Sequence, residues 1–216
     1  MRKARLVVEG HGELDAAPIL MNRLWRHLGL SPDVAWDSPA IRSPRDLKRQ
    51  DAVVQACELV RPKRDTAMLL VLRDDEDGCP AKSGPETASW VHTLGLPFPT
   101  SVVMAYREFE TWFLPSIHSI AGVPLPNGRP GLRPGVAFAG SNYEGSRDSK
   151  YWLTEHMNAG RRYSETMDQA GFTRLLDLAA VQNSGIDSFS VLCRALIALD
   201  QATPGSVYPP PRPATP

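Results

Sequence analysis

The feature that most constrains the fold is an uninterrupted apolar segment that ends at a run of acidic residues. Ala67–Leu72 contains six apolar residues in succession, and after Arg73 come four acidic residues, Asp74–Asp77. A segment without polar alternation predicts a strand buried on both faces, as in a parallel sheet. Further strands are expected over residues 5–9, 34–36 and 101–105, and helices over residues 14–28, 43–60 and 85–94. Strands that alternate with helices, without hairpin signals, predict an α/β fold with a mainly parallel sheet flanked by helices.

The second half of the chain is predicted to be helical and to end in a proline-rich tail. Residues 122–145 are rich in glycine and proline and are expected to form a long loop. Helices are predicted over residues 108–120, 150–157, 164–178 and 187–200. The expected organisation is an α/β core over 1–121, a loop and helical region packed on that core over 122–202, and a disordered tail over 203–216.

The composition argues against several classes of protein. Lys plus Arg and Asp plus Glu number 24 each, so no overall field attracts nucleic acid or a membrane surface. No apolar run approaches the roughly 18 residues that a membrane-spanning helix needs, and the first residues do not have the pattern of a secretory signal. The three cysteines include no C-x-x-C pair, which argues against a disulfide scaffold or a structural zinc site. A cytoplasmic protein without membrane contact is therefore expected.

Acidic residues follow three of the predicted strands. Glu9 and Glu13 follow the first strand, Asp74–Asp77 follow the strongest one, and Glu108 and Glu110 follow the strand that ends at Ala105. The carboxyl ends of parallel strands share one edge of a sheet, so these acids are expected to meet there. Two carboxylates about 4 Å apart repel by roughly 4 kcal/mol at an effective dielectric near 20, which favours binding of a cation.

Oxygen ligands without paired His or Cys select Mg²⁺ or Mn²⁺, ions that activate water and neutralise phosphodiesters. The plainer interpretation of Asp74–Asp77 is a solvated turn. On spacing alone, the sequence leaves the metal site and the solvated turn equally open.

The acidic motifs resemble those of Toprim domains. Val8-Glu9-Gly10-His11-Gly12-Glu13 is similar to their V-E-G-x-x-E opening, and Asp74-Asp75-Glu76 is similar to their D-x-D motif. The chain also resembles small bacterial Toprim-related proteins of unknown function over about residues 4 to 200. That likeness rests on three sets of residues: Arg73–Pro80; Arg107–Leu114, with the pattern R-E-F-E-x-W-F-L; and Lys150, Tyr163, Asp168-Gln169 and Ser188-Phe189.

The resemblance implies a Toprim-like sheet that binds Mg²⁺ or Mn²⁺. It makes Glu9 a metal ligand or general acid/base, and makes Asp74 and Glu76 metal ligands. A shift by one residue gives Asp75-Glu76-Asp77, which matches D-x-D literally and keeps Asp77 among the candidate ligands. Asp74 is the preferred first acid because it comes soonest after the apolar strand. The candidate metal ligands are Glu9, Glu13, Asp74, Glu76, Asp77, Glu108 and Glu110, and the candidate catalytic residues are Glu9, Asp74, Glu76 and Lys150.

Lys150 is expected to open a helix after the glycine-rich loop, where it would stabilise charge in a transition state. An exposed helical lysine is the commoner explanation of such a residue. Related small proteins are often encoded beside ABC-type or SMC-like ATPases. The resemblance therefore implies a metal-dependent nuclease acting on DNA or RNA, as the effector subunit of an ATPase-containing anti-phage or DNA-processing complex.

Two other functions are compatible with the sequence. The first is a non-catalytic Toprim-like subunit that regulates or bridges the ATPase. The second is a phosphoacceptor receiver domain, which explains Glu108, Glu110 and the long C-terminal region poorly. The sequence also leaves homo-oligomerisation open.

Overall fold

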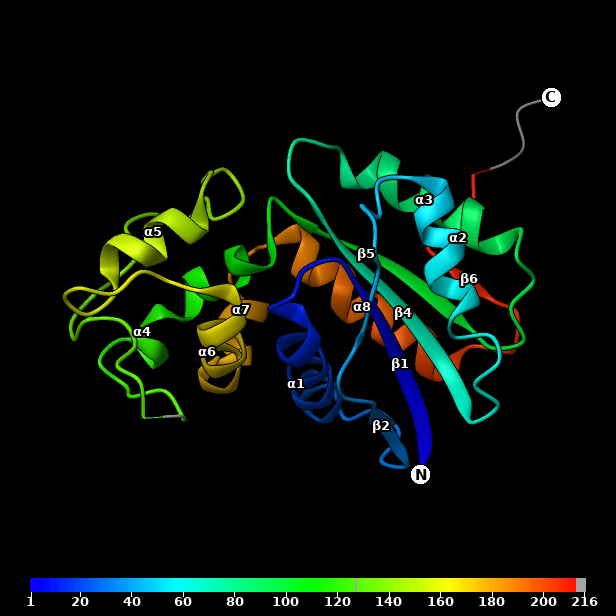
Figure 1. The fold of residues 1–216 in the computed structure, drawn as a ribbon, viewed down its shortest axis with the longest axis horizontal. Helices are drawn as coiled ribbons and strands as arrows, with labels where there is room; N and C mark the ends of the chain where they lie inside the picture. Colours follow the sequence, from blue (N-terminus) through cyan, green and yellow to red (C-terminus); the bar gives the residue numbers. More distant parts are fainter. Residues whose placement is uncertain (127, 213–216) are drawn as a thin grey trace.

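A computed structural model describes residues 1–126 and 128–212 of the chain. Its centre is a parallel sheet in the order β2-β1-β4-β5-β6, with β3 paired to the later part of β1. The strands are β1 (Arg2–Val8), β2 (Val34–Trp36), β3 (Ile41–Arg42), β4 (Thr66–Asp75), β5 (Thr100–Tyr106) and β6 (Val207–Tyr208). The predicted α/β class with a mainly parallel sheet is therefore confirmed (Figure 1).

Alternate side chains of β4 enter two separate hydrophobic cores. Met68, Leu70 and Leu72 belong to the core on one face of the sheet. Leu69 and Val71 belong to the core on the other face. Both sets are buried, which explains why the strand reads as a continuous apolar run.

Four helices cover the sheet. The helices α1 (Glu13–His27) and α8 (Asp187–Gln201) contribute to one core, and α2 (Gln50–Glu58) and α3 (Pro80–His92) contribute to the other. In α1, Ala17, Leu20 and Leu24 recur at helical spacing and are fully buried. No helix in the described parts of the chain is long and apolar enough to cross a membrane.

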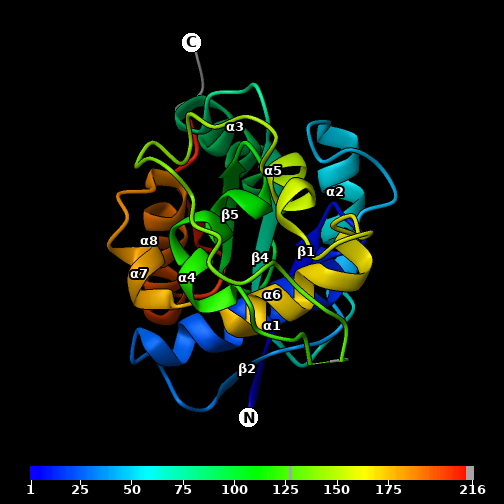
Figure 2. The same cartoon turned by 90° about the vertical axis from the view of Figure 1, so that its left-hand side faces the viewer.

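Shorter helices surround the carboxyl ends of β1, β4 and β5 (Figures 1 and 2). They are the 3₁₀ helix η1 (Phe109–Ser116), α4 (Ile117–Ile120), α5 (Ser149–His156), the π-helix η2 (Glu165–Gln169), α6 (Ala170–Leu175) and α7 (Leu178–Gln182). Aromatic contacts join these helices to α8 and to one another: Trp112 of η1 packs edge-on against Phe189 of α8, and Phe113 of η1 against Phe172 of α6. The helical part therefore packs on the same edge as the acidic residues.

Several sequence-based expectations differ from the structure. The helix expected over 164–178 is the π-helix η2 followed by α6, which ends at Leu175. The helix expected from Ser43 begins at Gln50, because the Ser43 hydroxyl donates to the Arg45 carbonyl and accepts from the Arg45 amide within a turn. The helix expected over 108–120 is a 3₁₀ helix followed by one α turn, with Pro115 inside the 3₁₀ part.

The expectation of a disordered tail is wrong for Val207–Tyr208. These residues form β6, which pairs with Thr100 and Ser101 of β5. The tail continues beyond this strand, and the Arg212 amide donates to Ser89 on α3. A strand was not anticipated here because prolines surround only two residues with strand preference. Residues 213–216 lie outside the described residues.

Candidate functional site

The three acidic segments meet at one edge of the sheet. β4 lies between β1 and β5, and all three strands run in the same direction. Asp74 is level with Ala105 of β5, so Glu108 and Glu110 follow close to the end of β4. The convergence expected from a parallel sheet is therefore present, and it brings residues more than sixty positions apart into one region.

Strand alternation separates Asp74 from Asp75. Asp74 continues the series of Met68, Leu70 and Leu72 towards the α1 face, and its Oδ1 accepts a hydrogen bond from the Phe109 amide at 3.0 Å. Asp75 is directed to the opposite face, where it accepts from Ser83 Oγ at 2.7 Å. Asp74 is thus the acid that the strand directs towards the other carboxylates.

Asp75 also pairs with Arg73, since the two side chains lie on the same face with a separation of 3.5 Å between Asp75 Oδ1 and Arg73 Nη2. Both side chains are about 4% exposed. This pair is enclosed between the sheet and α3, so Asp75 balances a buried arginine rather than facing the acidic edge. The geometry supports the frame that starts at Asp74.

Glu13 is held at the start of α1 by the turn that precedes it. Its Oε2 accepts from the amides of Glu9 and Gly10 at 3.1 and 3.0 Å, and its side chain is buried. Burial raises the pKa of Glu13, while the two backbone hydrogen bonds oppose that rise. The glycine turn therefore fixes a carboxylate directly beside the end of β1.

Glu110 is fully buried and is oriented by two side chains from the C-terminal half. Its Oε1 accepts from the Tyr163 hydroxyl at 2.8 Å and from Gln169 Nε2 at 3.0 Å. Its Oε2 is buried and has no hydrogen-bond partner. Burial raises the pKa of Glu110 to about 8. One oxygen is thus locked in place, and the other is available to a cation.

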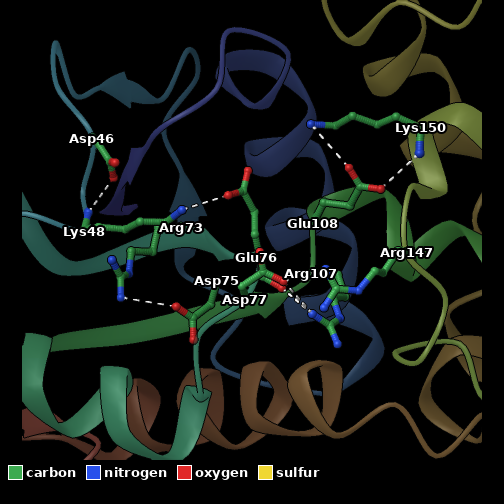
Figure 3. Close-up of polar contacts among 10 residues, drawn as sticks. All are labelled: Asp46, Lys48, Arg73, Asp75, Glu76, Asp77, Arg107, Glu108, Arg147 and Lys150. Carbon is green, nitrogen blue, oxygen red and sulfur yellow. Dashed lines mark hydrogen bonds and ion pairs between the residues drawn. The ribbon is translucent and has the colours of Figure 1, made fainter.

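Lys150 is seated among the carboxylates. Its Nζ lies 2.8 Å from Glu165 Oε1, 3.5 Å from Glu108 Oε2 and 3.8 Å from Glu110 Oε2. Its backbone amide also donates to Glu108 Oε1 at 3.0 Å, as Figure 3 shows. Burial acts to lower the pKa of Lys150, but the carboxylates of Glu110 and Glu165 outweigh it and raise that pKa. The ammonium group is therefore charged and compensates the acids around it.

We call the residues at this position the inner cluster: Glu13, Asp74, Glu108, Glu110 and Lys150. The four acidic side chains of the inner cluster lie close enough for their negative charges to repel one another. The pKa of Asp74 is raised well above its usual range, first by burial and then by the carboxylates of Glu13 and Glu110. Ionisation of these carboxyl groups is unfavourable in the absence of a further cation, and binding of such a cation would favour it.

The remaining predicted acids lie further out. The side chain of Glu76 is 68% exposed and pairs with Lys48 Nζ at 2.9 Å. Asp77 is 73% exposed and pairs with Arg147 at 2.8 Å and Arg107 at 3.3 Å. Figure 3 shows the Glu76–Lys48 pair to the left of Glu108, and Asp77 with Arg107 and Arg147 below it. We call these contacts the outer pairs. The structure does not bring Glu76 and Asp77 into the inner cluster.

Glu9 is close to both the inner cluster and the outer pairs, since Glu13 and Lys48 both influence its pKa. It is half-buried, and its pKa is raised to about 7, first by burial and then by the nearby carboxyl group of Asp46. Lys48 acts in the opposite direction and lowers it. A carboxyl group with a pKa near neutrality is suited to accept and release a proton.

Two backbone positions next to the inner cluster adopt the left-handed conformation without being glycine. Arg107 has a φ of 68° and directly precedes Glu108, and Asp148 has a φ of 62° two residues before Lys150. These are the non-glycine residues with positive φ in the described part of the chain. Such conformations cost free energy and occur often at functional sites. Here they aim Glu108 and Lys150 towards each other.

Several contributors were not identified from the sequence. No sequence motif includes Glu165, Asp46 or Lys48. Tyr163 and Gln169 are indicated by the sequence only as part of the resemblance to Toprim-related proteins. A sequence signal does exist at Gly12, where a Cβ atom would lie 2.4 Å from Gln169 Oε1 and 2.7 Å from the Glu165 carbonyl oxygen. This glycine allows the π-helix η2 to approach the β1–α1 turn, and π-helices are frequent at functional sites.

A cavity of about 570 Å³ lies elsewhere, between α3 and α8 and beside the part of β5 that β6 does not pair with. It is lined mainly by apolar side chains, including Val102, Met104 and Val191. Glu144 also lines it, but both of its oxygens accept from the first amides of α8, at 2.9 and 3.1 Å. The carboxyl groups whose pKa is raised, in the described part of the chain, are all at the acidic edge: Glu9, Glu13, Asp74 and Glu110. This edge is the candidate site.

The donor set of the acidic edge consists of oxygen atoms, which suits Mg²⁺ or Mn²⁺. The buried Glu110 Oε2 without a hydrogen-bond partner fits such an ion. As the side chains stand, no three His, Cys, Asp or Glu residues within 1–126 and 128–212 are arranged as a ready ligand set. Comparison of the chain with protein-family models, curated proteins and solved structures finds no match.

Proposed function

We propose that the protein is a Toprim-like, Mg²⁺- or Mn²⁺-dependent nuclease that hydrolyses phosphodiester bonds of DNA or RNA. The observation that carries the proposal is the inner cluster itself. Three strand ends place Asp74, Glu13 and Glu110 together, and each has a raised pKa. Carboxyl groups that are held together in this way, with raised pKa values, are typical of sites where the protein uses their charge or their proton.

Asp74, Glu13 and Glu110 would hold the cation, with Glu9 beside them. When bound, the metal would supply Lewis-acid activation of water and neutralise charge on the phosphate. Tyr163 and Gln169 orient Glu110 by their hydrogen bonds to its Oε1. Such contacts to a ligand's other oxygen commonly set metal affinity.

The chain also supplies acid–base and electrostatic groups of its own. Glu9, with a pKa of about 7, would take a proton from the attacking water at its carboxylate. Glu108 Oε1 accepts from the backbone amide of Lys150 at 3.0 Å and so keeps the start of α5 at the mouth of the site, where a substrate phosphate would approach the ammonium group. That ammonium would stabilise the charge that develops in the transition state.

A protein partner would deliver the substrate. The chain carries 24 basic and 24 acidic residues, so it lacks the overall positive field of a stand-alone nucleic-acid binder. The proposed partner is an ABC-type or SMC-like ATPase, in which this chain is the effector subunit. Addition of the partner should therefore raise the cleavage rate more than it raises metal affinity.

The test combines Mn²⁺ calorimetry with cleavage of labelled single- and double-stranded oligonucleotides. Wild type should bind Mn²⁺ and cleave, and Asp74→Asn should do neither while keeping its fold. Asp51→Asn is the matched control, because Asp51 is an exposed acid at the start of α2 that pairs with Arg45 and Arg49. Equal Mn²⁺ binding by wild type and Asp74→Asn would contradict the proposed site.

One observation favours the non-catalytic alternative, a Toprim-like regulatory subunit. Lys150 already provides the inner cluster with a positive charge, so the acids do not need a metal to be compensated. In that case Asp74→Asn would support the function of the ATPase complex as well as wild type does. Loss of function with intact assembly favours the nuclease.

A further inference from the structure

The inner cluster contains a cation that belongs to the chain. Lys150 Nζ is within 4 Å of carboxylate oxygens from three residues, Glu108, Glu110 and Glu165. Glu110 Oε2, the buried oxygen without a hydrogen-bond partner, is one of these atoms. The ammonium group therefore faces the oxygen that the proposed metal would use.

We infer that Lys150 is a resident counter-cation, which occupies the acidic site in the metal-free protein and withdraws when a divalent cation binds. This inference rests on the proposed metal site and adds its regulation. Two cations that share Glu110 Oε2 would repel each other, because both would lie within a few ångströms of one oxygen. Metal affinity is then set by the difference between metal binding and lysine binding at the same carboxylates.

The geometry allows the side chain to move without the backbone. The amide of Lys150 is fixed by Glu108 Oε1 at 3.0 Å, so the start of α5 stays attached to the site. The side chain is 38% exposed and has four flexible methylene groups, which give its ammonium a route towards solvent.

Glu165 is positioned to keep Lys150 as an ion-pair partner after the lysine has left the inner carboxylates. It forms the shortest of the three ion pairs, at 2.8 Å, and its side chain is 39% exposed. Glu108 and Glu110 are far less exposed, at 14% and 0%. Lys150 can therefore keep its contact with Glu165 at the mouth of the site while it releases the two inner carboxylates.

The direct test is Mn²⁺ calorimetry on wild type, Lys150→Met and Lys150→Arg at one pH. Removal of the resident charge should tighten Mn²⁺ binding at least tenfold in Lys150→Met, and Lys150→Arg should stay near wild type. Lys3→Met is the matched control and should alter affinity less than threefold, since Lys3 lies at the start of β1, away from the acidic edge, and pairs with the exposed Asp65. Unchanged or weaker binding by Lys150→Met overturns the inference while leaving the proposed metal site intact.

A second measurement on the wild-type protein covers the case in which Lys150→Met does not fold. Reductive methylation with ¹³C-formaldehyde labels the lysine amines, and the Lys150 signal is assigned by its absence in Lys150→Arg. Titration with Mg²⁺ should shift this signal with a midpoint equal to the Kd that calorimetry gives for Mg²⁺. A Lys150 signal that stays constant while Mg²⁺ binds overturns the inference. Absence of metal binding in wild type and Lys150→Met alike refutes the proposed function and this inference together.

Discussion

The inner cluster and the outer pairs contain the same kinds of residue and differ in burial. In the inner cluster, Glu110 is fully buried and its pKa is raised to about 8. In the outer pairs, the side chains of Glu76 and Asp77 are 68% and 73% exposed and have basic partners at the surface. Exposed ion pairs contribute little free energy, whereas buried like charges are costly unless a cation compensates them. Burial therefore separates acids arranged for cation binding from acids that form a solvated turn.

The largest expected difference is in metal affinity. Glu110→Gln should weaken Mn²⁺ binding at least 100-fold, because it removes a buried ligand charge while keeping the shape of the side chain. Glu76→Gln should change it less than threefold, because Glu76 lies with Lys48 outside the inner cluster. Calorimetry on both variants, with circular dichroism as the control for folding, measures the two effects. A larger loss in Glu76→Gln would mean that the outer pairs form the site.

The next effect concerns how the inner cluster is assembled. Gly12→Ala should destabilise the protein by about 1–3 kcal/mol, because its Cβ would lie 2.4 Å from Gln169 Oε1 and 2.7 Å from the Glu165 carbonyl oxygen. Gly10→Ala in the same turn is the control, since its Cβ would meet its nearest neighbour at an ordinary 3.5 Å. Urea unfolding of both variants gives the comparison. Equal stability of the two would show that η2 does not rest closely on this turn.

The two regions should also respond differently to pH. The folded-state pKa of Glu110 lies above the usual value for a glutamate, so its contribution to stability is complete below about pH 4.5. It is lost as the pH rises through about 8, with a slope of at most about 1.4 kcal/mol per pH unit. In metal-free protein, Glu110→Gln should therefore lose less stability than wild type between pH 5 and 8.5. Parallel stability curves for Glu110→Gln and wild type would contradict the raised pKa.

The same protonation opposes metal binding. Apparent Mn²⁺ affinity should rise from pH 6 to 8.5, by up to roughly tenfold for each proton released per pH unit. Calorimetry in buffers of different ionisation enthalpy counts those protons. A pH-independent affinity would mean that metal binding releases no proton, which would contradict a site built on the raised pKa values of Glu13, Asp74 and Glu110.

The smallest effect is expected for the outer pairs themselves. Lys48→Met should lower the free energy of unfolding by less than about 1 kcal/mol, because an exposed ion pair is screened by water and salt. Addition of 0.5 M NaCl should reduce this difference further. Thermal unfolding at two salt concentrations is sufficient to detect it. A loss above 2 kcal/mol would mean that Lys48 has a structural role beyond its contact with Glu76.

The sequence allowed the sheet and the convergence of its acidic edge to be predicted. The apolar run before Asp74 indicated a strand buried on both faces, and parallel strands dictate that their carboxyl ends meet. Strand alternation also separates Asp74 from Asp75 once the start of the strand is known. The prediction that Asp74 is the first acid of the motif therefore had a physical basis.

Other parts of the site depend on contacts that sequence spacing does not encode. Tyr163 and Gln169 reach Glu110 from more than fifty residues away, through a long loop and a π-helix. Glu165 enters the site only because Gly12 permits a close approach. Glu76 and Asp77 were candidate ligands together with Asp74 in the sequence. Their exposure and their pairing with Lys48, Arg107 and Arg147 are visible only in the structure.

The measurement that tests the central claim most directly is the anomalous scattering of Mn²⁺ in crystals of the protein grown at pH 8. The account predicts a peak about 2 Å from carboxylate oxygens of Asp74, Glu13 or Glu110, with Lys150 Nζ displaced from Glu110. A peak at Glu76 and Asp77, or no peak at saturating Mn²⁺ with Lys150 still beside Glu110, would contradict it.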